Sequence, residues 1–170
     1  MNIRRMIILG LFVAIAGVLH AVECWVPLPL PIPGVKLGLA NIVALAVIEL
    51  YGWRDALVIS ILRVFLGTLL AGVIFGPAFI MSFAGAVAST LAMAVGCKYL
   101  RSKLFSLVGI SVIGALVHNI AQLSIAAVLV VSSGVFWFLP YLVLFSVPTG
   151  VVTGVGVTYF FRKLPQNIIL

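Results

Sequence analysis

The sequence predicts an all-α integral membrane protein, built as one domain of six transmembrane helices over residues 1–170. The composition supports this class, because 65% of the residues are apolar and only 8% are charged, whereas soluble domains carry about 25% charged residues. The mean hydropathy is +1.39. These values exclude a soluble globular fold before any motif is considered.

Six apolar segments are long enough, or nearly long enough, to form helices that cross the roughly 30 Å hydrocarbon core of a bilayer. They cover residues 6–22, 37–51, 56–71, 78–95, 107–131 and 136–161. The second and third are shorter than the roughly 20 residues of a full span. We therefore expect turn residues to extend them, or protein rather than lipid to surround them.

The first segment also resembles a secretory signal peptide. Arg4 and Arg5 precede its apolar run, and the triplet Ala14-Ile15-Ala16 resembles a cleavage site. A signal peptide is normally followed by a soluble domain, whereas five further apolar segments follow here. We therefore expect an uncleaved first transmembrane helix.

The distribution of basic residues predicts the orientation of the bundle. With the N-terminus inside, eight of the ten Lys and Arg residues lie on the cytoplasmic side, as the positive-inside rule requires. These eight are Arg4, Arg5, Arg54, Lys98, Arg101, Lys103, Arg162 and Lys163. The sequence thus predicts cytoplasmic N- and C-termini, and loop position accounts for most of the net charge of +7 without nucleic-acid binding.

Ionisable and amide side chains inside the bundle mark a candidate ligand site, because such groups are costly within a membrane. Helical spacing places them on shared faces, and a rise of 1.5 Å per residue places them in the outer half of the bundle. The candidates are His20 and Glu23 of the first segment, Lys36 and Asn41 at the start of the second, and His118, Asn119 and Gln122 of the fifth. We favour a cavity open to the exterior, and the alternative is a set of interhelical hydrogen bonds that only hold the bundle together.

Arg63, inside the third segment, has two interpretations. It either contacts the ligand or forms a buried ion pair with Glu49 of the antiparallel second segment. The estimated depths are roughly 12 Å from the inner face for Arg63 and roughly 3 Å for Glu49, which two long side chains can bridge. We favour the pair over ligand contact.

A proline-rich segment connects the first two spans at the outer face. Residues 26–34 alternate proline with apolar residues, which forbids a helix and favours polyproline II. At 3.1 Å per residue such a segment spans roughly 25 Å. We expect this strap to form a lid over the polar cavity, and the alternative is a rigid connector.

The chain lacks the residues for several classes of chemistry. Its three acids, Glu23, Glu49 and Asp55, are too scattered for carboxylate-pair hydrolysis or an acidic metal site. No Gly-rich loop ending in Lys-Ser or Lys-Thr is present to hold nucleotide phosphates. An enzyme that uses His118 or His20 as an acid or base is the least favoured hypothesis, because no second catalytic group lies at a fixed spacing. We therefore predict no catalysis, no metal and no cofactor.

The sequence PGVKLGLANI at residues 33–42 follows the proline-rich loop. In this decapeptide, in length and in number of spans, the chain resembles the Gx transporter family, whose members are often labelled heptaprenyl diphosphate synthase component I. That family in turn resembles the substrate-binding S components of energy-coupling factor (ECF) transporters, which are six-helix membrane proteins of about this size.

This resemblance implies a non-enzymatic subunit that binds a small-molecule substrate from outside the cytoplasmic membrane of a prokaryote. It also implies protein partners, namely a transmembrane coupling protein and two ATPase subunits. Small residues on the first helix of S components typically contact the coupling protein, and the matching residues are Gly10, Ala14, Gly17 and Ala21. The alternative is a non-catalytic membrane partner protein linked to isoprenoid or quinone metabolism or to redox assembly. Prenyl-chain synthesis itself is rejected, because the chain lacks the Asp-rich motifs of known synthases.

Overall fold

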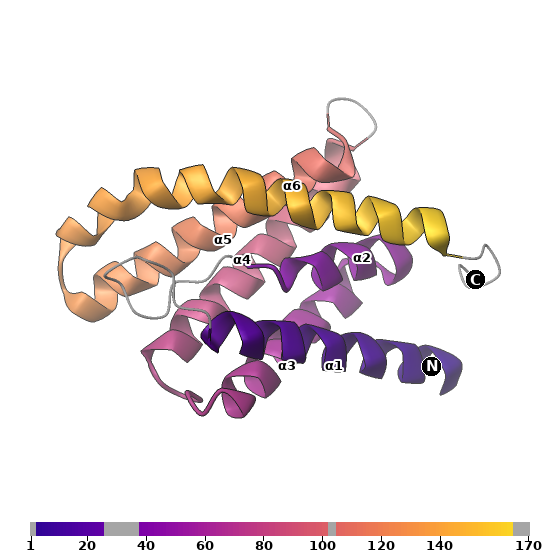
Figure 1. The fold of residues 1–170 in the computed structure, drawn as a ribbon, viewed down its shortest axis with the longest axis horizontal. Helices are drawn as coiled ribbons and strands as arrows, with labels where there is room; N and C mark the ends of the chain where they lie inside the picture. The colour runs from indigo at the N-terminus through magenta and orange to yellow at the C-terminus, as the bar shows by residue number, and fades with distance from the viewer. Residues whose placement is uncertain (1–2, 26–37, 102–104, 165–170) are drawn as a thin grey trace.

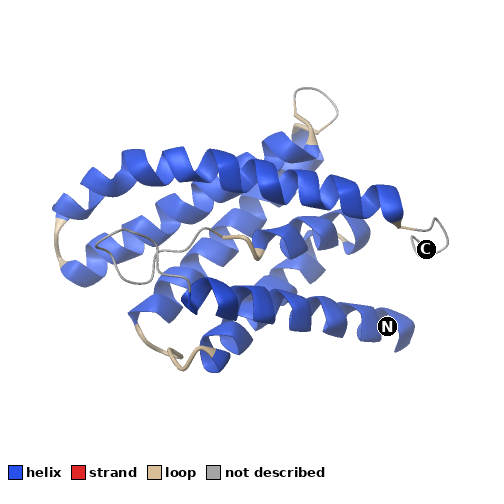
Figure 2. Cartoon of the chain, viewed as in Figure 1, coloured by secondary structure: helices blue, strands red, loops and turns tan. Residues whose placement is uncertain are grey.

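The computed structural model describes residues 3–25, 38–101 and 105–164. Within these ranges every regular element is a helix (Figure 2), which confirms the predicted all-α class. The elements are α1 (Ile3–Trp25), α2 (Asn41–Tyr51), α3 (Trp53–Leu70), α4 (Pro77–Tyr99), α5 (Leu107–Val130), the 3₁₀ helix η1 (Ser133–Phe138) and α6 (Leu139–Lys163). Each predicted apolar segment therefore contains one α-helix.

Four of the described helical segments are long and apolar enough to cross a membrane, namely α1, α4, α5 and the continuous η1–α6 segment. The chain is thus a multi-pass membrane protein. By contrast, α2 has only 11 residues, and the 18 residues of α3 include the charged residues Arg54, Asp55 and Arg63. Six full crossings therefore stay a prediction.

Local sequence explains where several helices begin and end. Gly52 joins α2 to α3 at a φ of 93°, a backbone conformation that favours glycine. Pro77 lies in the first turn of α4, where the missing N–H removes no helical hydrogen bond. Ser106 caps α5, because its hydroxyl accepts a hydrogen bond from the N–H of Gly109. These residues fix the short connections around the bundle.

The short helix α2 lies at the centre of the bundle. α1 packs against α3, α3 against α4, α4 against α5 and α5 against α6, and all five contact α2. In Figure 1, α2 is accordingly seen between α1 and α6. The rings of Phe12 in α1 and Phe160 in α6 meet edge to face with their centroids 6.4 Å apart. The longer helices therefore enclose α2.

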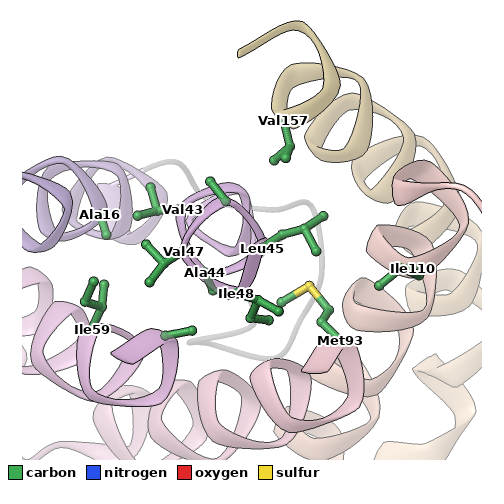
Figure 3. Close-up of a cluster of buried hydrophobic side chains, with 12 residues drawn as sticks. Ala16, Val43, Ala44, Leu45, Val47, Ile48, Ile59, Met93, Ile110 and Val157 are labelled. Carbon is green, nitrogen blue, oxygen red and sulfur yellow. The ribbon is translucent and has the colours of Figure 1, made fainter. Parts of the chain in front are cut away.

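The apolar core is built around α2, and residues 43–48 of this helix are all buried. Figure 3 shows Val43 directed towards Ala16 of α1 and Ile48 towards Met93 of α4. Neighbouring helices, and not lipid, surround such a helix along its length. The backbone N–H and C=O groups at its two ends can therefore lie inside the protein and need not reach the membrane surface. Of the two sequence interpretations of this short segment, the structure supports a helix surrounded by protein.

Glycine brings α5 and α6 into close contact. A Cβ added to Gly150 of α6 would lie 2.4 Å from Val112 Cα in α5, which is closer than real atoms approach. Gly154, one turn later, faces the backbone of α5 in the same way. Between the two helices, the hydroxyls of Ser111 and Thr153 also form a hydrogen bond. The α5–α6 contact therefore depends on the absence of side chains at these glycines.

The first turn of α1 and the last turn of α6 lie at one end of the bundle (Figure 1). Two ion pairs of the described residues involve this region. Arg5 pairs with Asp55, and Arg101 pairs with Glu49 at the C-terminal end of α2. The favoured prediction of an Arg63–Glu49 pair is therefore wrong. The rise per residue gives only the depth of a side chain along its helix and not the direction in which the side chain points. The Arg63 side chain reaches the other end of α2, where it contacts Asn41.

Candidate functional site

A cluster of buried polar side chains lies at the end of the bundle opposite to the ion pairs. Glu23 lies 18 residues after Arg5 in α1, a rise of about 27 Å. Arg63 of α3 donates a hydrogen bond from Nη2 to Asn41 Oδ1 of α2 over 2.7 Å. The charge of Glu23 attracts that of Arg63, and the Glu23 carboxylate accepts a hydrogen bond from the N–H of Leu39. These contacts join α1, α2 and α3.

The cluster continues into α4 and α5 through Ser89. The Ser89 hydroxyl donates to Asn41 Oδ1 over 3.3 Å and lies 3.5 Å from His118 Nδ1. His118 and Gln122 pack against Gly85 of α4, where an added Cβ would lie 2.9 Å from His118 Cε1 and 3.0 Å from Gln122 Cγ. A row of polar side chains thus extends from α1 to α5 through the interior of the bundle.

Two further glycines make room for the cluster. Gly38 has a φ of 79°, and a Cβ there would lie 2.9 Å from Asn41 Nδ2. Gly67 of α3 receives the ring of His20, because a Cβ there would lie 2.5 Å from His20 Cδ2. Sequence reasoning missed these glycines and Ser89, since Gly and Ser are frequent in membrane helices. The position of Gly38 within PGVKLGLANI, three residues before Asn41, is the signal that could have found it.

Asn119 joins α5 to α6 instead. Its Nδ2 donates to Ser146 Oγ over 2.8 Å and to the Leu142 carbonyl over 3.3 Å. These are the interhelical bonds that the alternative interpretation expects of a buried amide. Of the neighbouring residues 118 and 119, the first therefore contacts α4 and the second contacts α6.

Arg63 and Asn41 carry buried donors that lack acceptors. Arg63 is 1% exposed, and neither its Nε nor its Nη1 has a hydrogen-bond partner among the described residues. Asn41 Nδ2 is also buried and has no hydrogen-bond partner among the described residues. A buried donor without an acceptor costs about 1–3 kcal/mol, and more when the group is charged. Within the described residues, these donors are thus left without the acceptors that would offset this cost.

The structure brings most of the predicted ligand residues into one region. Glu23, Asn41, Arg63, His118 and Gln122 belong to the cluster, and His20 lies three residues from Glu23 on the same face of α1. Lys36 and the proline-rich segment 26–34 lie outside the described residues. Their predicted roles as mouth cation and lid therefore stay predictions.

The residues predicted to dock a coupling protein separate into two pairs. Gly10 and Ala14 lie on the exposed face of α1, and nothing lies within 4 Å of a Cβ added to Gly10. Gly17 and Ala21 are buried, and a Cβ on Gly17 would lie 3.3 Å from Leu66 Cβ of α3. Gly17 and Ala21 therefore pack α1 against α3, and docking of a coupling protein on this helix stays a prediction.

Two clefts lined by described residues lie away from the cluster. One, of about 430 Å³, lies at the charged end beside Glu49 and Arg101. The other, of about 650 Å³, lies beside η1 and is lined by Ser132 and Phe136 among others. In the described part of the chain, no three His, Cys, Asp or Glu side chains are close enough to hold a metal ion. The polar groups of the cluster can form hydrogen bonds and interact with charge.

The family described as heptaprenyl diphosphate synthase component I matches residues 12–160. Neither the curated proteins nor the solved structures contain a match. The family match begins inside α1 and ends inside α6, so it includes the whole polar cluster. This chain therefore belongs to the heptaprenyl diphosphate synthase component I family.

Proposed function

We propose that the chain is the substrate-binding membrane subunit, or S component, of an ECF-type transporter and captures a small molecule from the extracellular side. The observation that supports this most is the buried cluster around Arg63 and Asn41, with donors that no described residue satisfies. Polar groups inside a membrane protein are costly and by default mark a substrate pathway. Residues needed only to hold helices together would satisfy each other, as the hydroxyls of Ser60 and Thr90 do.

In this proposal the chain supplies recognition and its partners supply energy. A transmembrane coupling protein and two ATPase subunits would bind it, since the sequence has no nucleotide-binding loop of its own. The protein would lie in the cytoplasmic membrane of a prokaryote. Both termini and the charged end would face the cytoplasm, where the positive-inside rule places basic residues. The polar cluster would then lie towards the exterior, and the chain itself would catalyse nothing.

The family description favours a second candidate function. Its words name a component of a heptaprenyl diphosphate synthase, which is consistent with a non-catalytic membrane partner of isoprenoid or quinone metabolism or of redox assembly. In that role the buried polar residues would only join helices. The two functions differ in what the protein binds, a small molecule together with ATPase subunits or a soluble enzyme of isoprenoid synthesis.

Co-purification tests the transporter proposal. An affinity-tagged chain, expressed with a coupling protein and two ATPases, is expected to purify as a complex that hydrolyses ATP, whereas the chain alone is expected not to. Ala14→Trp, on the exposed face of α1, should weaken the complex at least tenfold, because it replaces a small residue at the expected docking face. Val152→Trp, on the exposed face of α6, is the matched control and should leave it intact.

Two results would contradict the transporter proposal. One is that the ATPases do not associate with the chain, and the other is that a prenyl diphosphate synthase subunit purifies with it at equal amount. If Ala14→Trp and Val152→Trp weaken the complex equally, the complex forms but the assignment of the docking face is wrong.

A further inference from the structure

The unfilled donors around Arg63 indicate which chemical group the site receives. Arg63 Nε, Arg63 Nη1 and Asn41 Nδ2 are all buried without an acceptor among the described residues. They are held together, since Arg63 Nη2 donates to the Oδ1 atom of the same Asn41 amide. A guanidinium carries five N–H donors and no acceptor, and an amide nitrogen carries two more donors. The group that completes this site must therefore be rich in acceptors.

We infer that the site binds the carboxylate or carbonyl oxygens of a small molecule on Arg63 and Asn41, and that this head carries at most one negative charge. The inference rests on the proposed function, because it names the substrate class of the same site. Oxygen acceptors are the groups that guanidinium and amide donors bind best inside a protein. A hydroxyl oxygen is a weaker acceptor than a carboxylate or carbonyl oxygen, and it brings a further donor to a site whose donors already lack acceptors among the described residues.

The limit on charge comes from Glu23. Its carboxylate already lies close enough to Arg63 for the two opposite charges to attract each other. Glu23 is also buried, and it is fixed by the N–H of Leu39. One added negative charge therefore shares Arg63 with Glu23, whereas a doubly charged phosphate would bring a second negative charge into a medium of low dielectric constant.

The head group can be tested with probes that share one apolar body. Benzoate, benzamide, benzyl alcohol and phenyl phosphate carry a carboxylate, a neutral carbonyl, a hydroxyl and a dianionic phosphate on the same ring. The thermal unfolding temperature of the purified chain in detergent reports their binding, because a ligand that binds the folded state stabilises it. Benzoate and benzamide at millimolar concentration are expected to raise this temperature by about 2–4 °C. Benzyl alcohol and phenyl phosphate are expected to leave it unchanged.

Three variants assign the effect to these donors. Arg63→Lys keeps the positive charge and removes the guanidinium nitrogens, so it should abolish the benzoate shift. Asn41→Asp introduces a carboxylate that belongs to the chain and lies beside Arg63. This carboxylate should occupy the Arg63 donors, so the variant should unfold at a higher temperature without ligand and should show no benzoate shift. Ser60→Ala is the matched control, because Ser60 lies one turn before Arg63 and bonds to Thr90, 2.7 Å away, outside the cluster. It should keep the shift.

The outcomes separate this inference from the proposed function. An equal shift with phenyl phosphate or benzyl alcohol, or a benzoate shift that persists in Arg63→Lys, would overturn the head-group assignment. If the wild-type chain retains a small molecule on purification but neither benzoate nor benzamide raises its unfolding temperature, the head-group assignment fails and the capture function stands. If the chain retains no small molecule and no probe raises its unfolding temperature, the head-group assignment and the capture function both fail.

Discussion

Replacing Arg63 by methionine is expected to lower the free energy of unfolding by about 1–3 kcal/mol, the range found when a buried polar group loses its hydrogen-bond partner. Arg63 is 1% exposed, and its charge compensates that of the buried Glu23. The variant leaves the Glu23 carboxylate without this opposite charge and removes the hydrogen bond to Asn41. Denaturant unfolding of the purified protein in detergent measures the loss.

A double-mutant cycle shows whether the charge of Glu23 carries the effect. Adding Glu23→Gln to Arg63→Met removes the second charge, so more than half of the lost stability should return. Leu62→Ala, at the neighbouring and exposed position of α3, is the control and should cost less than about 1 kcal/mol. If the losses in Arg63→Met and Glu23→Gln simply add, the two residues do not act as a pair.

Gly150→Ala is the second substitution with a large expected effect, a loss of about 1–3 kcal/mol from overpacking. The new Cβ would lie 2.4 Å from Val112 Cα and 2.8 Å from Val112 N. These are backbone atoms of α5, so no side-chain rotation can relieve the overlap. The two helices must move apart, which also strains the hydrogen bond between Ser111 and Thr153.

Gly10→Ala is the matched control for the α5–α6 contact. No atom lies within 4 Å of a Cβ at Gly10, so alanine should stabilise α1 by up to about 1 kcal/mol through its higher helix propensity. Unfolding curves of the two variants should therefore shift in opposite directions. A shift of the same sign and size in both would show that the close approach of α5 and α6 does not limit stability.

The sequence alone predicted the position of each α-helix in the described residues, because hydropathy reports apolar length directly. The predicted ends were less accurate. α1 begins at Ile3 and α4 continues to Tyr99, each beyond its apolar segment, since long charged and aromatic side chains near a helix end reach the interface while their backbone stays helical. Hydropathy cannot place such ends, because the polar residues there are still part of the helix.

The sequence predicted that several polar residues would lie close together, but it did not predict the contacts between them. The convergence of Glu23, Asn41 and His118 followed from depth, which sequence spacing gives. The partner of Arg63 could not be predicted in this way, because the depth of a side chain leaves its direction around the helix undetermined. Ser89 was missed for a related reason, since its role comes from bridging Asn41 and His118, which lie on two other helices.

Capture of a small molecule by the cluster around Arg63 and Asn41 can be tested by mass spectrometry of what the purified chain releases on denaturation. The wild-type chain and Ser60→Ala are expected to release the same compound, with carboxylate or carbonyl oxygens, in near-equal amount to protein. Asn41→Leu should release at least about tenfold less, corresponding to about 1.4 kcal/mol of lost binding. Release of no compound from the wild-type chain, or an undiminished amount from a folded Asn41→Leu variant, would contradict the account.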